Sequence, residues 1–257
     1  MSPKTTLITA GAVFAGLFAT LSANAQTTIS VDFIGGSGSN GTPAAMSASE
    51  TAGVAIGGTV RNNWNSISGG SGTGVAGLVT DDGSTLATTT LSFSSGGTWS
   101  TGVSDTPGNN RMMKGFLDGT NTAFSLTNLP FAGAYDLYIY FDGDNGGAQR
   151  NADFALSGVG AGYGVDSPNV NFGGAFVQAT GNSDVPGSNY IVYTGLTGSS
   201  VSIAGIGGFS SDGTIRAPIN GFQLAGNIIV VPEASTLVLL VGAGLSAVVF
   251  VKRRRTA

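Results

Sequence analysis

The sequence contains no cysteine and no histidine, and only 9% of its 257 residues are charged. Without thiol or imidazole side chains the chain has no disulfide framework, no Ser-His-Asp triad, no cysteine nucleophile and no His/Cys zinc site. Most familiar catalytic devices are therefore excluded. The missing cysteines also fit a domain of about 200 residues, which buries enough surface to fold without covalent cross-links.

Basic residues are scarce in the middle of the chain. Between the two terminal segments, thirteen acidic residues stand against five basic ones, which gives a net charge of about −8. Nucleic-acid binding depends on neutralising phosphates with Lys and Arg, and no basic stripe with interleaved aromatics is present. The composition excludes nucleic acid as a partner and favours solubility outside the cell and contact with divalent cations.

The N-terminus has the pattern of a secretory signal. Lys4 is followed by an apolar stretch from about Leu7 to Leu21, and Ala23-Asn24-Ala25 supplies the small residues at which signal peptidase cuts. We therefore expect residues 1–25 to be a signal peptide cleaved after Ala25, at a site marked by Ala23 and Ala25. An uncleaved anchor or a buried helix is the alternative.

The C-terminus has the pattern of a membrane anchor. After a linker and a short box at 228–235, the segment 236–251 has sixteen uncharged residues, and the tail 252–257 holds four basic ones. At about 1.5 Å per residue, an apolar helix counted from Ala234 to Val251 falls just short of the roughly 30 Å of a hydrocarbon core. The basic tail predicts a cytoplasmic end, with everything before Pro232 outside.

This ending resembles the PEP-CTERM sorting signal of Gram-negative bacteria, also catalogued as an ice-binding-protein C-terminal domain. The apolar span Leu237 to Val251 follows the box, and Ala234 replaces the usual second proline. The resemblance implies transient insertion in the inner membrane, cutting near the box by an exosortase, and delivery to the cell surface or to an extracellular matrix rich in exopolysaccharide. The sorting residues that it marks are Val231, Pro232, Glu233, Arg253, Arg254 and Arg255.

Residues 26–227 show the period-two alternation of β-strands rather than a helical stripe. In Tyr135 to Phe141, Tyr135, Leu137, Ile139 and Phe141 fall on one face, and Tyr138 and Tyr140 fall on the other, half-exposed one. Arg111 to Leu117 is the best candidate for a helical turn, and the Gly-Gly pairs have no fixed period that would indicate a solenoid. We predict an all-β domain, an antiparallel β-sandwich or jelly roll. The other expected strands are Thr28–Phe33, Thr85–Phe93, Ala123–Leu129, Ala152–Leu156, Gly174–Ala179, Tyr190–Leu196, Ser200–Ala204 and Ile219–Ala225.

The same region resembles the malectin-like and galactose-binding-like jelly rolls found in PEP-CTERM proteins. The resemblance implies that the first and last strands, Ile29–Phe33 and Ile219–Leu224, are neighbours in one sheet. The segments that carry it are Ile29–Phe33, Asn62–Asn65, Arg111–Gly115, Tyr135–Tyr140 with Asp142–Asn145, and Arg216–Leu224.

An acidic, Gly-rich turn follows the Tyr135–Phe141 strand. Carboxylates two residues apart, Asp142 and Asp144, are typical of calcium loops, and Asp153 comes eleven residues after Asp142, where an EF-hand has its bidentate Glu. Calcium held by Asp142, Asp144 and Asp153 is one hypothesis. The alternative is a polar hairpin turn in which Asp and Asn bind their own backbone.

Carbohydrate binding needs an exposed aromatic ring with a few polar neighbours. The candidates are Trp64, Trp99, Tyr138, Tyr140 and Tyr163, each of which has a core or edge position as its alternative. We expect a non-catalytic surface or matrix protein in contact with extracellular polysaccharide.

Two other function classes remain as alternatives. A carboxylate-based glycosidase or lyase needs two carboxylates across a cleft, and the middle of the chain has Glu50 as its single Glu. Adsorption to ice or another surface needs a regular array of Thr, and Thr88 to Thr90 is the only run of that kind.

Overall fold

The computed structural model describes residues 26–36, 40–144, 148, 150–157, 162–167, 171–180 and 187–228. The predicted signal peptide, sorting box, membrane helix and basic tail lie outside these residues. Within the described ranges, no helix is long and apolar enough to cross a membrane.

The described chain is mostly β-strand, which confirms the all-β prediction. Neighbouring strands are antiparallel, except that β1 and β4 are parallel. A five-stranded sheet has the order β11 (Tyr190–Leu196), β8 (Phe131–Tyr140), β13 (Gly221–Ile228), β1 (Thr27–Gly35) and β4 (Asn65–Ser68). A six-stranded sheet has the order β10 (Gly162–Ser167), β9 (Arg150–Leu156), β12 (Ser200–Ser210), β7 (Gly115–Thr127), β6 (Thr90–Ser100) and β5 (Ser71–Val75). The hairpin β2 (Ala52–Ile56) and β3 (Thr59–Arg61) and the helical turn α1 (Asn109–Met112) lie outside both sheets.

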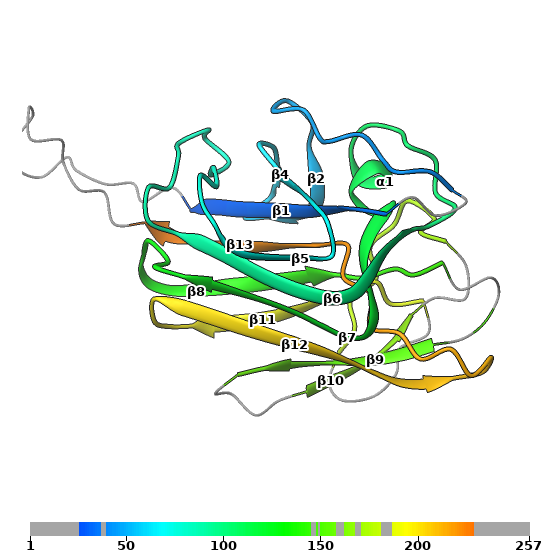
Figure 1. The fold of residues 1–257 in the computed structure, drawn as a ribbon. Coiled ribbons are helices and arrows are strands. Elements are labelled where there is room, and N and C mark those ends of the chain that lie inside the picture. The colour runs from blue at the N-terminus through cyan, green and yellow to red at the C-terminus, as the bar shows by residue number, and fades with distance from the viewer. Residues whose placement is uncertain are drawn as a thin grey trace, which may run out of the picture.

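The strands are arranged in two sheets (Figure 1). A continuous apolar core lies between the two sheets. The alternation of β8 places Leu137 and Ile139 in this core, as the sequence predicts. Phe124 of β7 stacks on Phe222 of β13 with ring centroids 4.2 Å apart, so an aromatic pair joins the two sheets. Rings packed in this way contribute about 0.5–1.5 kcal/mol beyond the area they bury.

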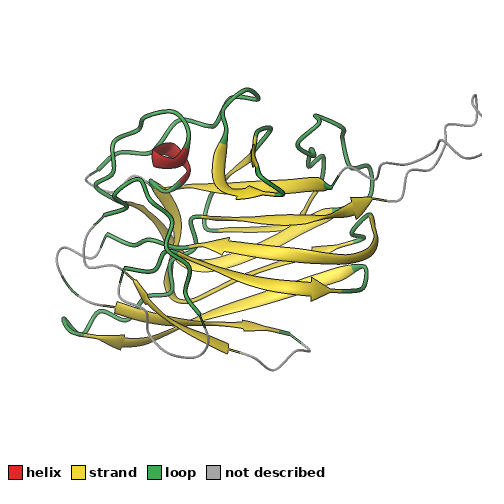
Figure 2. Ribbon diagram, turned by 180° about the vertical axis from the view of Figure 1, so that it is seen from behind, coloured by secondary structure: helices red, strands yellow, loops and turns green. Residues whose placement is uncertain are grey.

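The first and last strands are neighbours, as the resemblance to jelly rolls implies. β1 and β13 are antiparallel, with Ile29 opposite Leu224 and Thr27 opposite Gly226. The described chain therefore begins and ends at one end of the two-layered structure. Figure 2 shows α1 at the other end of this structure.

Other segments cover much of the face of β8 that carries Tyr138 and Tyr140, so the predicted exposure is wrong for Tyr140, whereas Tyr138 is half-buried. Residues of the loops before β2 and after β3, and of α1, pack on it as a second apolar cluster. Tyr140 is fully buried, and its hydroxyl donates to Gln223 Oε1 at 2.6 Å and accepts from the backbone N–H of Val54 at 3.0 Å. These loops have no hydrophobic periodicity, which is why the sequence did not reveal the cover.

Three other expected elements are corrected. The predicted strand Gly174–Ala179 is a loop that touches β11 through one bridge, Gln178 to Tyr190. The side-chain amide of Asn189 binds the N–H of Val177 and the carbonyl of Ala175, so the backbone pairing with β11 is confined to the end of the segment. Of the expected Thr85–Phe93, only the part from Thr90 onward is a regular strand. The expected helical turn at Arg111–Leu117 ends early, because α1 ends at Met112 and β7 begins at Gly115.

Candidate functional site

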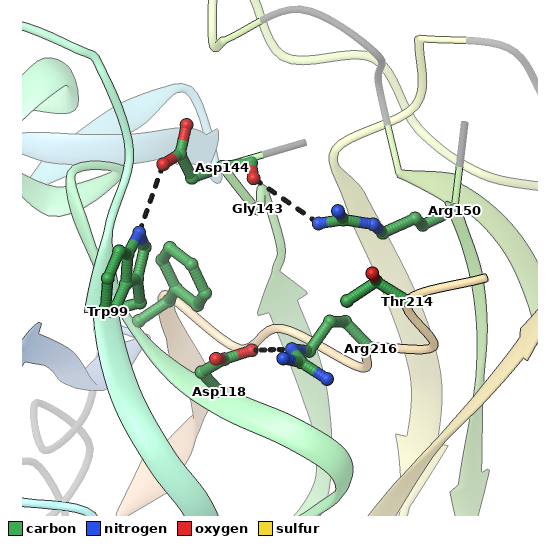
Figure 3. Close-up of a pocket in the computed structure, with 8 residues that line it drawn as sticks. Trp99, Asp118, Gly143, Asp144, Arg150, Thr214 and Arg216 are labelled. Carbon is green, nitrogen blue, oxygen red and sulfur yellow. Dashed lines mark hydrogen bonds and ion pairs between the residues drawn. The ribbon is translucent and has the colours of Figure 1, made fainter. Parts of the chain in front are cut away.

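A hollow of about 250 Å³ lies where five chain segments meet, at the end of the sandwich opposite residues 26 and 228. The end of β6, the start of β7, the turn after β8, the start of β9 and the segment after β12 each contribute to it. We call it the Trp99 hollow. Its lining residues are Trp99, Phe116, Asp118, Gly143, Asp144, Arg150, Thr214 and Arg216 (Figure 3).

Two aromatic side chains form one wall of the Trp99 hollow. Trp99 and Phe116 are cross-strand partners on β6 and β7. Phe116 is buried, whereas Trp99 is 40% exposed. The indole N–H of Trp99 donates to Asp144 Oδ2 at 3.0 Å, and the side-chain amide of Asn40 donates to the same oxygen at 3.3 Å. These bonds fix the orientation of the ring while leaving part of it open to solvent.

Glycines behind this wall allow three backbones to approach each other closely. A Cβ on Gly115 would overlap the carbonyl oxygen of Ile34, and a Cβ on Gly35 would overlap that of Trp99. Gly35 also has a φ of 76°, a left-handed conformation that favours glycine. The glycines therefore let the end of β1 pass directly behind Trp99, which sets the position of the wall.

Two arginines lie across the hollow from Trp99 (Figure 3). Arg216 Nε lies 2.9 Å from Asp118 Oδ1, and Arg150 forms an ion pair with Asp212 at 2.6 Å. Arg150 also donates to the backbone carbonyl of Asp144 at 3.3 Å. The guanidiniums thus connect the turn after β8, the start of β7 and the segment after β12.

The pKa values of two carboxyl groups near the hollow are shifted in opposite directions, one by burial and the other by hydrogen bonds. Burial raises the pKa of Asp118 above its ordinary value, although the nearby Arg216 guanidinium opposes that rise. Hydrogen bonds from Arg150, first of all, hold the pKa of the exposed Asp212 below its ordinary value. Asp118 is therefore the harder of the two to ionise.

The groups around the Trp99 hollow suit a small polar ring with one apolar face. An exposed indole offers a flat apolar surface with a polar edge. Guanidinium N–H groups are hydrogen-bond donors, carboxylate oxygens are acceptors, and a Thr hydroxyl is both. A ring with hydroxyl groups would find a stacking surface on one side and both kinds of hydrogen-bond partner on the other.

The structure corrects most of the predicted aromatic platforms. Trp64 is 5% exposed, and its indole N–H donates to the carbonyl of Arg61, so it has no open face. Tyr140 is fully buried, and Tyr138 packs half-buried against the second apolar cluster. The side chain of Tyr163 lies outside what the structure describes. Trp99 is the candidate that lies at a hollow.

The predicted calcium ligands do not come together, and this hypothesis is wrong for the residues named. Asp142 is fully buried, and one of its carboxylate oxygens accepts from the backbone N–H of Phe172 at 2.8 Å. Asp153 is exposed on β9, and Asp144 accepts the Trp99 and Asn40 bonds. In the part of the chain that the structure describes, no three acidic side chains are placed to hold a metal ion.

Sequence reasoning did not assign Phe116, Asp118, Arg150 or Thr214 to a site, and it left Arg216 without a function. Arginines are rare in an acidic domain, and that scarcity is the one available signal. It does not distinguish Arg150 and Arg216 from Arg111, which forms ion pairs with Glu50 and Asp105 and does not line the hollow.

Comparisons with known proteins give little further information. No protein-family model matches the chain, and no curated protein matches it. Among solved structures, the chain is similar to "Bacteroides uniformis beta-glucuronidase 2 covalently bound to cyclophellitol-6-carboxylate aziridine", with 11% identity and a TM-score of 0.34. The match covers 65% of this chain and 20% of the other, and it is too distant to support an argument about fold or function.

Proposed function

We propose that this chain is an exported, non-catalytic surface or matrix protein whose jelly-roll ectodomain binds glycans through the Trp99 hollow. The observation that carries the proposal is the indole of Trp99, which is 40% exposed and is oriented by its hydrogen bond to Asp144. It faces two arginines across a hollow of about 250 Å³. Ligand pockets for drug-sized molecules usually measure about 300–1,000 Å³. The hollow therefore suits roughly one sugar ring.

Export and sorting to the cell surface rest on the sequence of the two ends. The signal-like segment 1–25 and the box, apolar span and basic tail of 228–257 support delivery by a signal peptidase and an exosortase-type enzyme. An extracellular polysaccharide is the partner that this destination offers.

Binding is favoured over catalysis because the carboxylates at the hollow already have strong partners. A glycosidase needs one protonated acid and one free carboxylate on the two sides of the bond. Asp118 is paired with Arg216, and Asp144 accepts two hydrogen bonds. The raised pKa of Asp118 is the one observation that favours the enzyme alternative, and release of reducing ends from polysaccharides by the protein would support it.

Adsorption to ice receives no support from its predicted residues. Thr89 is buried, and its hydroxyl donates to the carbonyl of Asn128 at 2.7 Å. Thr90 pairs with Thr127 on β7. The run Thr88 to Thr90 therefore does not form a flat, exposed array.

The experiment is a glycan array probed with the full chain and with two variants. Trp99→Ala removes the stacking surface, and Phe209→Ala removes another exposed aromatic ring that does not line the hollow. We expect the wild type and Phe209→Ala to retain the same glycans and Trp99→Ala to lose them. Retention of no glycan by the wild type, or equal retention by Trp99→Ala, would contradict the proposal.

A further inference from the structure

We infer that the Trp99 hollow selects uncharged sugars over sugars that carry a carboxylate, an inference that rests on the proposed function. The first argument is the charge balance of the lining. Its charged residues are two aspartates, Asp118 and Asp144, and two arginines, Arg150 and Arg216. Their formal charges cancel, and Asp212 on Arg150 adds one negative charge beside them.

The second argument is that both arginines already have carboxylate partners. Arg216 binds Asp118 at 2.9 Å, and Arg150 binds Asp212 at 2.6 Å. A uronate carboxylate would have to share these guanidiniums with the resident carboxylates, and a charge removed from water without its own partner is costly. A neutral hydroxyl exchanges hydrogen bonds with water for hydrogen bonds with the protein and brings no such cost.

The third argument concerns the surface beyond the hollow. Each described arginine forms an ion pair, and the buried Lys114 donates to the carbonyl of Val103. The acidic excess of residues 26–228 therefore has no compensating basic patch in the described ranges. Long-range attraction, which depends on complementary charge, is absent for a polyanionic glycan.

The test uses an array of glycan pairs that differ only in the oxidation of one terminal sugar, such as glucose and glucuronate, galactose and galacturonate, and mannose and mannuronate. We expect the full chain to retain the neutral member of a bound pair at least about tenfold more tightly, a difference of about 1.4 kcal/mol. Retention of neutral members should also change little between low and high salt, because no net charge is screened.

Asp118→Asn sharpens the test because it leaves Arg216 without its carboxylate. We expect this variant to shift its preference toward the uronate member, and the double variant Asp118→Asn/Arg216→Gln to return to the neutral one. The salt dependence of the wild type gives an answer even if these variants fold poorly.

The outcomes separate the two proposals. Preferential binding of uronates by the wild type, lost in Trp99→Ala, would overturn the selectivity and leave glycan binding standing. Absence of binding to any member, or binding that Trp99→Ala leaves unchanged, would overturn both the selectivity and the proposed glycan binding.

Discussion

Trp99 and Asp144 connect the two sheets through one hydrogen bond. Trp99 is on β6 of the six-stranded sheet, Asp144 follows β8 of the five-stranded sheet, and the indole N–H donates to the carboxylate at 3.0 Å. The residue that offers the stacking surface is therefore also a link between the layers. Substitutions can measure the contributions of its ring and of its N–H group separately.

Trp99→Phe keeps an aromatic ring and removes the N–H donor. We expect glycan affinity to fall by about threefold to tenfold. This is less than the roughly 1.5–3 kcal/mol that a hydrogen bond to a charged acceptor contributes, because Asn40 still donates to Asp144 in the variant. Titration calorimetry with a glycan retained on the array measures this. An affinity as low as that of Trp99→Ala would show that the hydrogen bond, and not the ring surface, dominates.

Asn220 joins its own segment to the start of β7 and to the turn after β8, and its loss should be among the most destabilising. Its side-chain amide donates to the carbonyls of Met113 and Gly115 at 2.9 and 3.0 Å, and its Oδ1 accepts from the backbone of Asp142. All of these groups are buried, so Asn220→Ala should lower the free energy of unfolding by about 3–5 kcal/mol.

Urea denaturation measures the change, and Asn121→Ala on the exposed face of β7 is the matched control. The control should stay within about 0.5 kcal/mol of the wild type. A similarly small effect at Asn220 would contradict its assignment as a link between segments.

Gly115→Ala tests the close backbone approach behind Trp99. The new Cβ would overlap the carbonyl of Ile34, which is backbone and cannot rotate away. We expect a loss of about 3 kcal/mol or more in unfolding free energy, together with weaker glycan binding, because β1 must move away from the Trp99 wall.

Gly97→Ala is the control, because nothing lies within 4 Å of a Cβ at that position of β6. Thermal unfolding of the two variants side by side should show a lowered Tm for Gly115→Ala alone. Equal Tm values would contradict the steric argument.

Because of Asp32, the free energy of unfolding should fall as the pH rises. Burial, above all, raises the pKa of this β1 carboxyl from 3.8 to about 6, with Glu50 adding to the rise and Ser66 and Arg111 opposing it. The folded state therefore holds a proton that the unfolded state has released between about pH 4 and pH 6. In this window the unfolding free energy decreases, by about 3 kcal/mol in all, and the loss is complete above the folded-state pKa.

Asp32→Asn removes that titration and keeps an oxygen to accept from Ser66, which now donates to Asp32 at 2.8 Å. Relative to the wild type, the variant should gain stability on going from pH 4 to pH 7. Urea unfolding of both proteins at several pH values measures the difference, in which the other carboxylates cancel. A constant difference across this range would show that Asp32 titrates normally in the folded protein.

The strands with regular alternation were predictable, and the cover over one sheet was not. The pattern of β8 assigned Leu137 and Ile139 to the core, and the pairing of β1 with β13 was also expected. Tyr140 was misplaced because its neighbours Met46 and Met112 come from loops and a single helical turn. Such residues belong to no regular hydrophobic pattern, so the sequence does not show which face of the sheet they cover.

The sequence singled out two residues of the site, Trp99 as a stacking surface and Asp144 in the different role of a calcium ligand. Trp99 stood among the aromatic candidates, but the residues opposite it come from four other places along the chain. A local sequence pattern can mark a turn such as Asp142–Asp144, yet it cannot show that Asp142 turns into the interior while Asp144 meets a tryptophan on another strand. Those positions depend on tertiary packing.

The antiparallel pairing of β1 and β13 also sets the distance between residue 228 and the Trp99 hollow. Nine residues of β1 at about 3.3 Å each span roughly 30 Å from Thr27, which pairs with Gly226, to the Trp99 hollow. A tether attached after residue 228 would thus have the sandwich itself as a rigid spacer, with the hollow at its outer tip. Cutting such a tether would free the molecule without removing any residue that lines the hollow.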